Sequence, residues 1–120
     1  MDATPMALPE QAIDRVALYF KALSDPTRLR ILNALRENER SVGELTDIAQ
    51  CSQANVSKHL RVLSDAGIVA RTPRGTTTVI SVADPAIYDL CSLVCDSVAR
   101  ELEKDLALHQ ALTASRKPVQ

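Results

Sequence analysis

Apolar residues recur at helical spacing in two short runs between residues 41 and 66, with a break between the runs. The first run consists of Val42, Leu45, Ile48 and Ala49, and the second of Val56, Leu60 and Leu63. Residues three and four apart share one face of a helix, so each run predicts a helix with one buried side. The pattern is interrupted at Gln50 and Cys51. The segment is therefore predicted to fold as two helices joined by a tight turn.

Capping residues stand at the expected ends of both helices. Ser41 and Glu44 have the spacing of a capping box, in which the hydroxyl accepts from the amide three residues on and the carboxylate accepts from the Ser amide. Ser52 is a second N-cap, ahead of Gln53. Gly67 can adopt the left-handed conformation that ends a helix. Two capped helices around a tight turn are typical of a helix-turn-helix.

The outward face of the second helix is polar, short-chained and basic. It begins at Ser52 and carries Gln53, Ala54, Ser57, Lys58 and Arg61. A DNA major groove admits one helix, and such side chains can hydrogen-bond with base edges or phosphates while the small ones permit close approach. We therefore expect these residues to bind DNA, with His59 either packing inward or contacting a phosphate. The alternative is a solvated helix face.

A basic hairpin is predicted directly after these helices. Residues 68–71 and 76–82 are rich in β-branched side chains, and the Thr-Pro-Arg-Gly sequence at 72–75 has the composition of a turn. A hairpin in this place would form the wing of a winged helix. Arg71, Arg74 and Thr76 would then contact phosphates or the minor groove. The alternative is that both arginines are solvated on an exposed turn.

Three further helices are predicted around this segment. The first opens at Pro9 and runs to about Leu23, and the second begins at Asp25-Pro26, where Asp caps and Pro occupies the first helical position. The last helix begins in the same way at Asp84-Pro85 and extends to about Leu112. We predict one domain over residues 9–113, with a flexible N-terminus at 1–8 and a flexible tail at 114–120. The fold class is mostly α with a small β-hairpin wing.

Several segments together resemble the ArsR/SmtB family of winged-helix repressors. The likeness is carried by residues 22–32 (ALSDPTRLRIL), 43–45 (GEL), 52–60 (SQANVSKHL) and 63–69, in the expected order. The resemblance implies a homodimer that binds double-stranded operator DNA near a promoter, usually represses, and is released by an inducer. In this family the dimer is formed by the first and last helices.

The last predicted helix has an apolar stripe that suits such an interface. Its apolar positions follow spacings of mostly three and four, which gives one continuous face. We expect the interface to contain Ile13, Val16 and Phe20 of the first helix and Ile87, Cys91, Val94, Val98 and Leu102 of the last. The alternative is that the last helix folds back onto its own domain.

Two of the three cysteines lie on this stripe. Cys91 and Cys95 are four residues apart, hence neighbours on one helical face, and two copies would bring four thiols together. Thiolates select soft ions such as Zn(II), Cd(II), Cu(I) or trivalent arsenic, and the pair could instead be persulfidated or oxidised. The alternative is that they are small buried hydrophobes. The same choice applies to Cys51, where packing under the turn is favoured.

The chain departs from the metal sensors of the family it resembles. Those that bind metal on the helix before the recognition helix carry Cys-Val-Cys, whereas this chain has Ser-Val-Gly at 41–43. Those that bind zinc between the last helices begin them with Asp-x-His, whereas Asp84 is followed by Pro and Ala, and Ser97 and Arg100 replace the later ligands. Both usual metal sites are therefore missing, and no cofactor is certain.

Composition narrows the function further. The 120 residues include 46% hydrophobic residues and carry a formal net charge of −1, so any positive patch has to be local. We see no catalytic motif and only three glycines, and we expect no enzyme. We find no targeting or membrane segment and expect a cytoplasmic protein. The alternatives are a regulator without small-molecule sensing and a winged-helix protein-interaction module.

Overall fold

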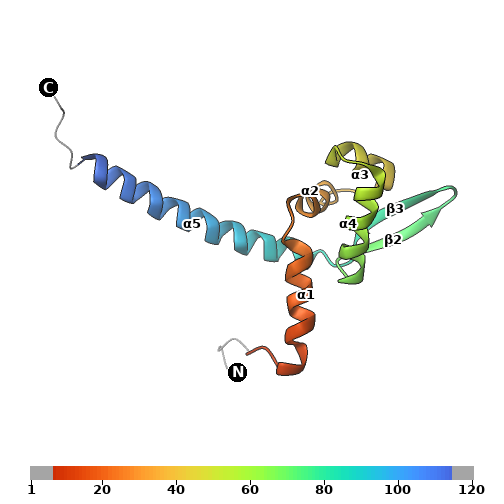
Figure 1. The fold of residues 1–120 in the computed structure, drawn as a ribbon, viewed down its shortest axis with the longest axis horizontal. Coiled ribbons are helices and arrows are strands. Elements are labelled where there is room, and N and C mark those ends of the chain that lie inside the picture. Colours follow the sequence, from red (N-terminus) through yellow and green to blue (C-terminus); the bar gives the residue numbers. More distant parts are fainter. Residues whose placement is uncertain (1–6, 115–120) are drawn as a thin grey trace. The chain divides into compact units, whose positions relative to one another are not determined.

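The computed structural model describes residues 7–114, which divide into two units between Asp84 and Pro85. The first unit contains, in chain order, a 3₁₀ turn η1 (Glu10–Ala12), α1 (Ile13–Leu23), α2 (Pro26–Ala34), β1 (Arg40–Ser41), α3 (Val42–Ala49), α4 (Gln53–Asp65), β2 (Val69–Arg74) and β3 (Thr77–Val82) (Figure 1). The second unit is the helix α5 (Ala86–Ala114). The predicted fold class is confirmed. Of the predicted flexible ends, residues 1–6 and 115–120 lie outside the described residues.

The first two helices begin as the sequence predicts. The helix expected from Pro9 starts with the 3₁₀ turn η1 and continues as α1 to Leu23. At the start of α2, the Asp25 carboxylate accepts a 3.0 Å hydrogen bond from the amide of Arg28, and Pro26 occupies the first helical turn. Proline fits there because its missing N–H would have no partner inside the helix.

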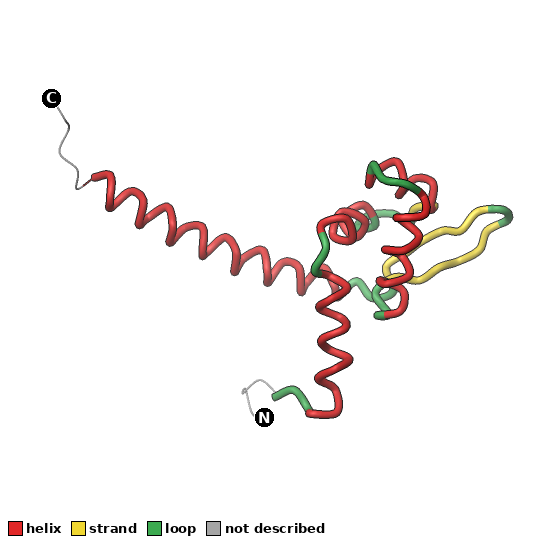
Figure 2. Tube along the Cα trace, in the orientation of Figure 1, coloured by secondary structure: helices red, strands yellow, loops and turns green. Residues whose placement is uncertain are grey.

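The sheet has three antiparallel strands in the order β1-β3-β2, and Figure 2 shows its β2–β3 hairpin in yellow. The two-residue strand β1 was not predicted, because two residues carry no readable alternation. The predicted turn at 72–75 is wrong: β2 continues through Arg74, which pairs with Thr77, and Gly75 (φ +61°) and Thr76 form the turn. Pro73 is tolerated because β2 lies at the edge of the sheet.

The hydrophobic core of the first unit is made by α2, α3, α4 and the sheet. Its fully buried large side chains are Ile31, Leu32, Leu45, Val56, Leu60, Leu63, Ile68 and Ile80. Two residues with helical apolar spacing, Leu29 and Ile48, are each 44% exposed and do not belong to this core. The core therefore holds α4 by one face and leaves its opposite face free.

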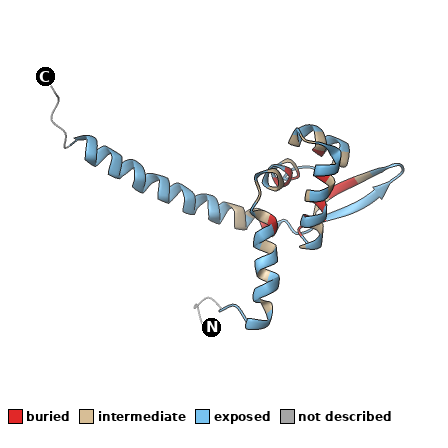
Figure 3. Cartoon of the chain, viewed as in Figure 1, coloured by how far each residue is buried: buried red, intermediate tan, exposed pale blue. Residues whose placement is uncertain are grey.

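The helix α5 is exposed along most of its length. Every residue from Ser92 to Ala114 is exposed, as the pale blue of Figure 3 shows, and its buried residue is Ile87. Many of the exposed side chains are aliphatic, Leu93, Val94, Val98 and Leu102 among them. No helix among residues 7–114 combines the length and the apolar character needed to cross a membrane.

Candidate nucleic-acid interface

The two capping motifs predicted from the sequence define a helix-turn-helix. The Ser41 hydroxyl accepts from the Glu44 amide at 3.1 Å, and a Glu44 carboxylate oxygen accepts from the Ser41 amide at 3.2 Å. Gln50 ends α3 in the left-handed conformation (φ +53°). Two residues later, the Ser52 hydroxyl accepts from the Asn55 amide at 3.1 Å. The turn between α3 and α4 is thus fixed by local contacts.

The end of α4 is equally well defined. The amide of Gly67 (φ +78°) donates to the carbonyl of Ser64, and the amide of Ile68 donates to the carbonyl of Leu63, each at 2.9 Å. This pair of bonds is a Schellman motif, which requires the left-handed residue that glycine supplies. The motif turns the chain directly from α4 into β2. The connection between α4 and the β2–β3 hairpin is therefore short and fixed.

The faces of α4 separate as expected. Val56, Leu60 and Leu63 are fully buried, whereas the predicted contact residues Ser52, Gln53, Ala54, Lys58 and Arg61 are exposed and Ser57 is half-buried. Val56, Leu60 and Leu63 are buried together because the helical repeat places residues three and four apart on one side of the helix. An exposed polar helix surface is thus available to a ligand.

A groove brings part of this surface together with the wing. It is an open hollow of about 440 Å³, lined by Val42, Gly43, Gln53, Ser57, Arg71, Thr76, Thr77 and Thr78. Four of these, Gln53, Ser57, Arg71 and Thr76, were predicted to contact DNA. They come from α4, from β2 and from the hairpin turn, so the fold joins groups that lie as far as 23 residues apart (76 − 53). The lining offers hydroxyl, amide and guanidinium groups.

Arg74 lies on the wing but already has a partner. Both of its terminal nitrogens face the carboxylate of Glu39, with Nη2 3.4 Å from Oε2. The two side chains are 58% and 45% exposed, so water competes for both charges. Sequence reasoning missed this pairing, because the two residues are 35 positions apart.

His59 lies away from the exposed face of α4. Its side chain is only 16% exposed, and its Nδ1 atom lies 3.1 Å from Nη1 of Arg28 and 3.8 Å from Oδ2 of Asp25. Of the two readings of His59 offered by the sequence, the structure places the ring in the packed arrangement. The sequence did not reveal Arg28 as its partner.

Two carboxylates next to this segment have perturbed titration. The backbone amide of Arg28 donates to Asp25 and holds the pKa of that carboxyl below its usual value; burial opposes this effect and the adjacent His59 reinforces it. The backbone amide of Ser41, and next its hydroxyl, lower the pKa of Glu44. In both cases the N-terminus of a helix stabilises the carboxylate. Both groups serve helix capping.

The three cysteines differ in exposure. Cys51, in the turn before α4, and Cys91 are half-buried, while Cys95 is exposed. Cys91 and Cys95 lie one turn apart on α5. Among residues 7–114, no three or more His, Cys, Asp or Glu side chains converge on a possible metal position. One copy of the described chain thus offers a pair of thiols and no complete ligand set.

The residues predicted for the dimer interface are mostly accessible. On α1, Ile13 is 39% and Phe20 is 52% exposed, and Val16 is half-buried. On α5, Val94, Val98 and Leu102 are 51%, 52% and 63% exposed. Ile87, also expected in the interface, is only 2% exposed, so its side chain retains little surface for a partner.

Comparison with known proteins identifies the family. A profile described as the bacterial regulatory protein, arsR family, matches residues 25–71, from the cap of α2 to the third residue of β2. The HTH-type transcriptional repressor SmtB of Mycobacterium tuberculosis is 35% identical over 95 residues, which are 79% of this chain and 68% of SmtB. The uncharacterized HTH-type transcriptional regulator Rv0081 of the same organism is 39% identical over 100 residues, 82% of this chain and 87% of Rv0081.

Solved structures agree with these relatives. The crystal structure of Rv0081 matches with a TM-score of 0.72 and 37% identity, covering 82% of this chain and 99% of that one. The solution structure of the homodimeric winged helix-turn-helix DNA-binding domain of Mb0332 from Mycobacterium bovis also gives a TM-score of 0.72, at 27% identity, covering 86% and 95%. The relatives are transcriptional regulators rather than enzymes, as expected from the sequence. With its capped helix-turn-helix and basic wing, this chain belongs to the ArsR family of bacterial regulatory proteins.

Proposed function

We propose that this protein is a homodimeric repressor that occupies double-stranded operator DNA. The observation that carries the proposal is the groove lined by Gln53 and Ser57 of α4 and by Arg71 and Thr76 of the wing. In the proposed complex α4 enters the major groove with its exposed polar face, and the wing contacts phosphates or the minor groove. Ser52, Ala54, Lys58 and Arg61 complete the contact surface of α4. The cytoplasmic location expected from the sequence is part of this proposal.

A second copy is needed for this task. Two recognition helices about 34 to 36 Å apart can read successive major grooves on one face of DNA. Exposed apolar residues on α1, such as Phe20, and on α5, such as Val94 and Leu102, are side chains that a second copy would cover. The homodimeric state of the Mb0332 domain supports the same arrangement.

The proposal is tested by binding to labelled duplex DNA from the region upstream of the protein's own gene. We expect wild type to retard this duplex more strongly than an unrelated one. Gln53→Ala is expected to weaken upstream-region binding about tenfold and to change unrelated binding little, because it removes a base contact. Lys58→Ala should weaken both and lower the salt slope by about 1.

Lys104→Ala is the matched control, because Lys104 is an exposed lysine of α5 that is paired with Glu101 at 3.1 Å. It should leave both affinities unchanged. Equal binding of wild type to the two duplexes, or absence of binding at low salt, would contradict the proposed function. A molecular mass of a monomer, measured in solution at the concentrations used for DNA binding, would contradict the dimer.

We propose further that a thiol-directed inducer releases the DNA through Cys91 and Cys95. The two side chains are one helical turn apart, with Cys91 half-buried and Cys95 exposed, and a symmetric pair of copies would supply four thiolates. A soft metal or metalloid ion would displace the thiol protons on binding, while a persulfide or an oxidant would modify the sulfur itself. Release requires that the inducer bind the DNA-free dimer more tightly than the DNA-bound one.

The test is a titration of the labelled DNA complex with arsenite, cadmium, zinc, persulfide and peroxide. We expect at least one of these to release DNA from wild type and to lose its effect on Cys91→Ser and Cys95→Ser, with unchanged DNA affinity. Cys51→Ser is the control, because Cys51 lies in the α3–α4 turn and outside this pair. If no agent releases wild type, the alternative holds: a winged-helix regulator or interaction module whose cysteines only pack.

A further inference from the structure

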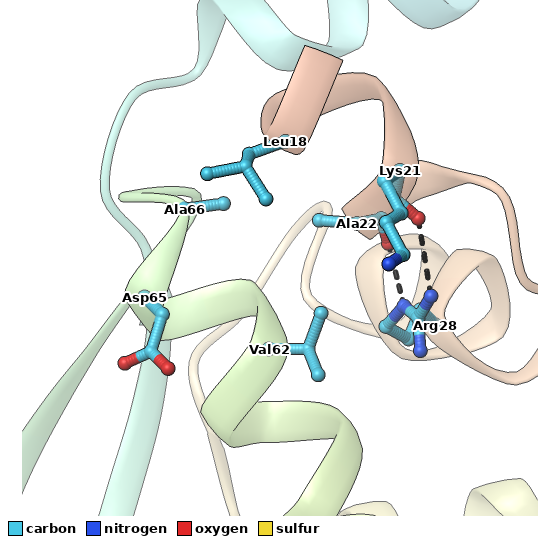
Figure 4. A pocket seen from close by; sticks show the side chains of 7 residues that line it. All are labelled: Leu18, Lys21, Ala22, Arg28, Val62, Asp65 and Ala66. Carbon is cyan, nitrogen blue, oxygen red and sulfur yellow. Dashed lines mark hydrogen bonds between the residues drawn. The ribbon is translucent and has the colours of Figure 1, made fainter. Parts of the chain in front are cut away.

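Arg28 closes the C-terminal end of α1. Its Nε donates to the carbonyl of Ala22 at 2.6 Å, and its Nη2 donates to the carbonyl of Lys21 at 3.1 Å, as Figure 4 shows. Carbonyls in the last turn of a helix have no partner within that helix, so a guanidinium that reaches two of them stabilises the helix end. Arg28 itself belongs to the first turn of α2.

The same guanidinium also reaches the recognition helix. Its third nitrogen, Nη1, lies 3.1 Å from Nδ1 of His59, 31 residues further along the chain. Arginine has donors but no acceptor, so in this hydrogen bond Nδ1 accepts and the ring proton lies on Nε2; the same Nδ1 atom lies 3.8 Å from Oδ2 of Asp25, to which it donates only when the ring carries a second proton. One planar group therefore connects the end of α1 with the middle of α4.

Part of the boundary between α1 and α4 is an open pocket beside Arg28. The pocket has a volume of about 370 Å³ and is lined by Leu18, Lys21, Ala22, Arg28, Val62, Asp65 and Ala66. In Figure 4, the side chain of Leu18 on α1 lies opposite Val62 of α4 and Ala66, the C-cap residue of α4. Where side chains leave such a gap, packing does not fix the distance between two helices.

The Arg28–His59 hydrogen bond adds a directional contact to the apolar packing that holds α4. The buried side chains of α4, such as Leu60, make apolar contacts, which are non-directional. A hydrogen bond weakens steeply when its angle or length changes. Because His59 directly follows Lys58, a rotation of α4 that breaks the bond to Arg28 also moves the exposed face.

We propose that Arg28 and His59 are positioning residues, which together fix the rotation of the recognition helix relative to α1. This inference rests on the proposed function, because it assigns to the pair a role in DNA affinity without contact to DNA. It also gives a path by which a change at α1 is transmitted to α4. The path is the hydrogen-bonded chain from the carbonyls of Lys21 and Ala22 through Arg28 to His59.

The test compares His59→Leu with His59→Asn, using the labelled upstream-region duplex. Leu fills similar space without an acceptor, whereas the Asn oxygen stands near the position of Nδ1 and can accept from Arg28. We expect Leu to weaken binding about tenfold, consistent with loss of a hydrogen bond to a charged group, and Asn to stay within about twofold of wild type. Arg28→Lys should weaken binding as much as His59→Leu, because an ammonium group cannot reproduce the three hydrogen bonds of the planar guanidinium.

Salt dependence separates positioning from phosphate contact. His59→Leu should keep the wild-type slope of log affinity against log salt, whereas Lys58→Ala should reduce it by about 1. Binding is measured well below the unfolding midpoint of each variant, so loss of folded protein does not imitate loss of affinity. Any of three results would overturn the inference. His59→Leu could reduce the salt slope, it could bind DNA as tightly as wild type, or it could weaken binding as much as His59→Asn does.

A measurement without DNA keeps this inference distinct from the proposed function. Long-range ¹H–¹⁵N spectra of the free protein should show His59 with unprotonated Nδ1, and the Arg28 Nε–H signal should be lost or shifted in His59→Leu but kept in His59→Asn. If the Arg28 signals are unchanged in His59→Leu, the Arg28–His59 hydrogen bond is contradicted, even if this variant still binds DNA. Intact signals with no DNA binding by wild type would instead contradict the proposed function alone.

Discussion

Arg74, the last residue of β2, is held by Glu39, and its Nη2 lies 3.4 Å from Oε2 of that residue. A guanidinium that contacts a phosphate must first give up such a partner. We therefore expect Glu39→Gln to tighten DNA binding about two- to fivefold at low salt, since exposed ion pairs contribute about 0.2–1 kcal/mol. The affinity is measured by fluorescence anisotropy across a salt series, which should become steeper.

The control for this prediction is Glu37→Gln, which removes the same charge from an exposed side chain two residues away. It should change affinity less, because only the general field of the protein changes. Equal tightening by both variants would mean that net charge, and not release of Arg74, is responsible.

The Asp25 cap predicts an acid-sensitive contribution to stability. Because the pKa of Asp25 is lowered in the folded protein, its contribution is complete above the pKa of an unfolded Asp, about 3.9, and is lost as pH falls through the lower folded value. Asp25→Asn keeps a capping oxygen without this titration. The gap in unfolding free energy between wild type and variant should therefore stay constant above about pH 5 and shrink as the pH falls below that value.

Urea unfolding at several pH values measures this gap. Asp25→Ser, another uncharged cap, should follow the same course as Asn. A gap that stays constant over the whole range would show that the charge of Asp25 contributes nothing to folding.

Loss of the α4 cap should destabilise the protein by a modest amount. Ser52→Ala removes the acceptor of the 3.1 Å bond from the Asn55 amide and should lower the free energy of unfolding by about 1 kcal/mol. Ser52→Asp keeps an acceptor and should recover most of the loss. The measurement is chemical denaturation, and equal stability of Ala and wild type would show that water replaces the hydroxyl.

Truncation of the core should cost more. Leu60 is fully buried, so Leu60→Ala should lower the free energy of unfolding by about 2–5 kcal/mol. Val62→Ala, two residues away on the same helix and 39% exposed, should cost less than about 1 kcal/mol. Similar losses for the two would contradict the burial pattern of α4.

Local chemistry explains which parts of the fold were predictable. The caps at Ser41 and Ser52 and the stop at Gly67 depend on residues at most a few positions apart, so the sequence displays them directly. The turn of the hairpin was misplaced because Pro73 is usually a turn residue, and its tolerance in β2 depends on β2 being an edge strand.

Contacts between distant residues explain what was missed. The partners of His59 and Arg74 are 31 and 35 positions away, and no spacing rule connects such pairs. The exposed face of α4 could be predicted, because Val56, Leu60 and Leu63 define the opposite side. The groove could not, since it forms only when α4 and the hairpin have taken their places.

Because α5 is exposed from Ser92 onward, the stability of this helix in the proposed dimer depends on protein concentration. An unsupported helix gains little beyond intrinsic propensity, and in the proposed dimer the partner would supply the packing that α5 lacks. When like chains associate, each tenfold dilution reduces the stability of the associated state relative to separate chains by about 1.4 kcal/mol. Dilute samples would then fray at α5 while the α4 core persists, and regulation would respond to cellular abundance.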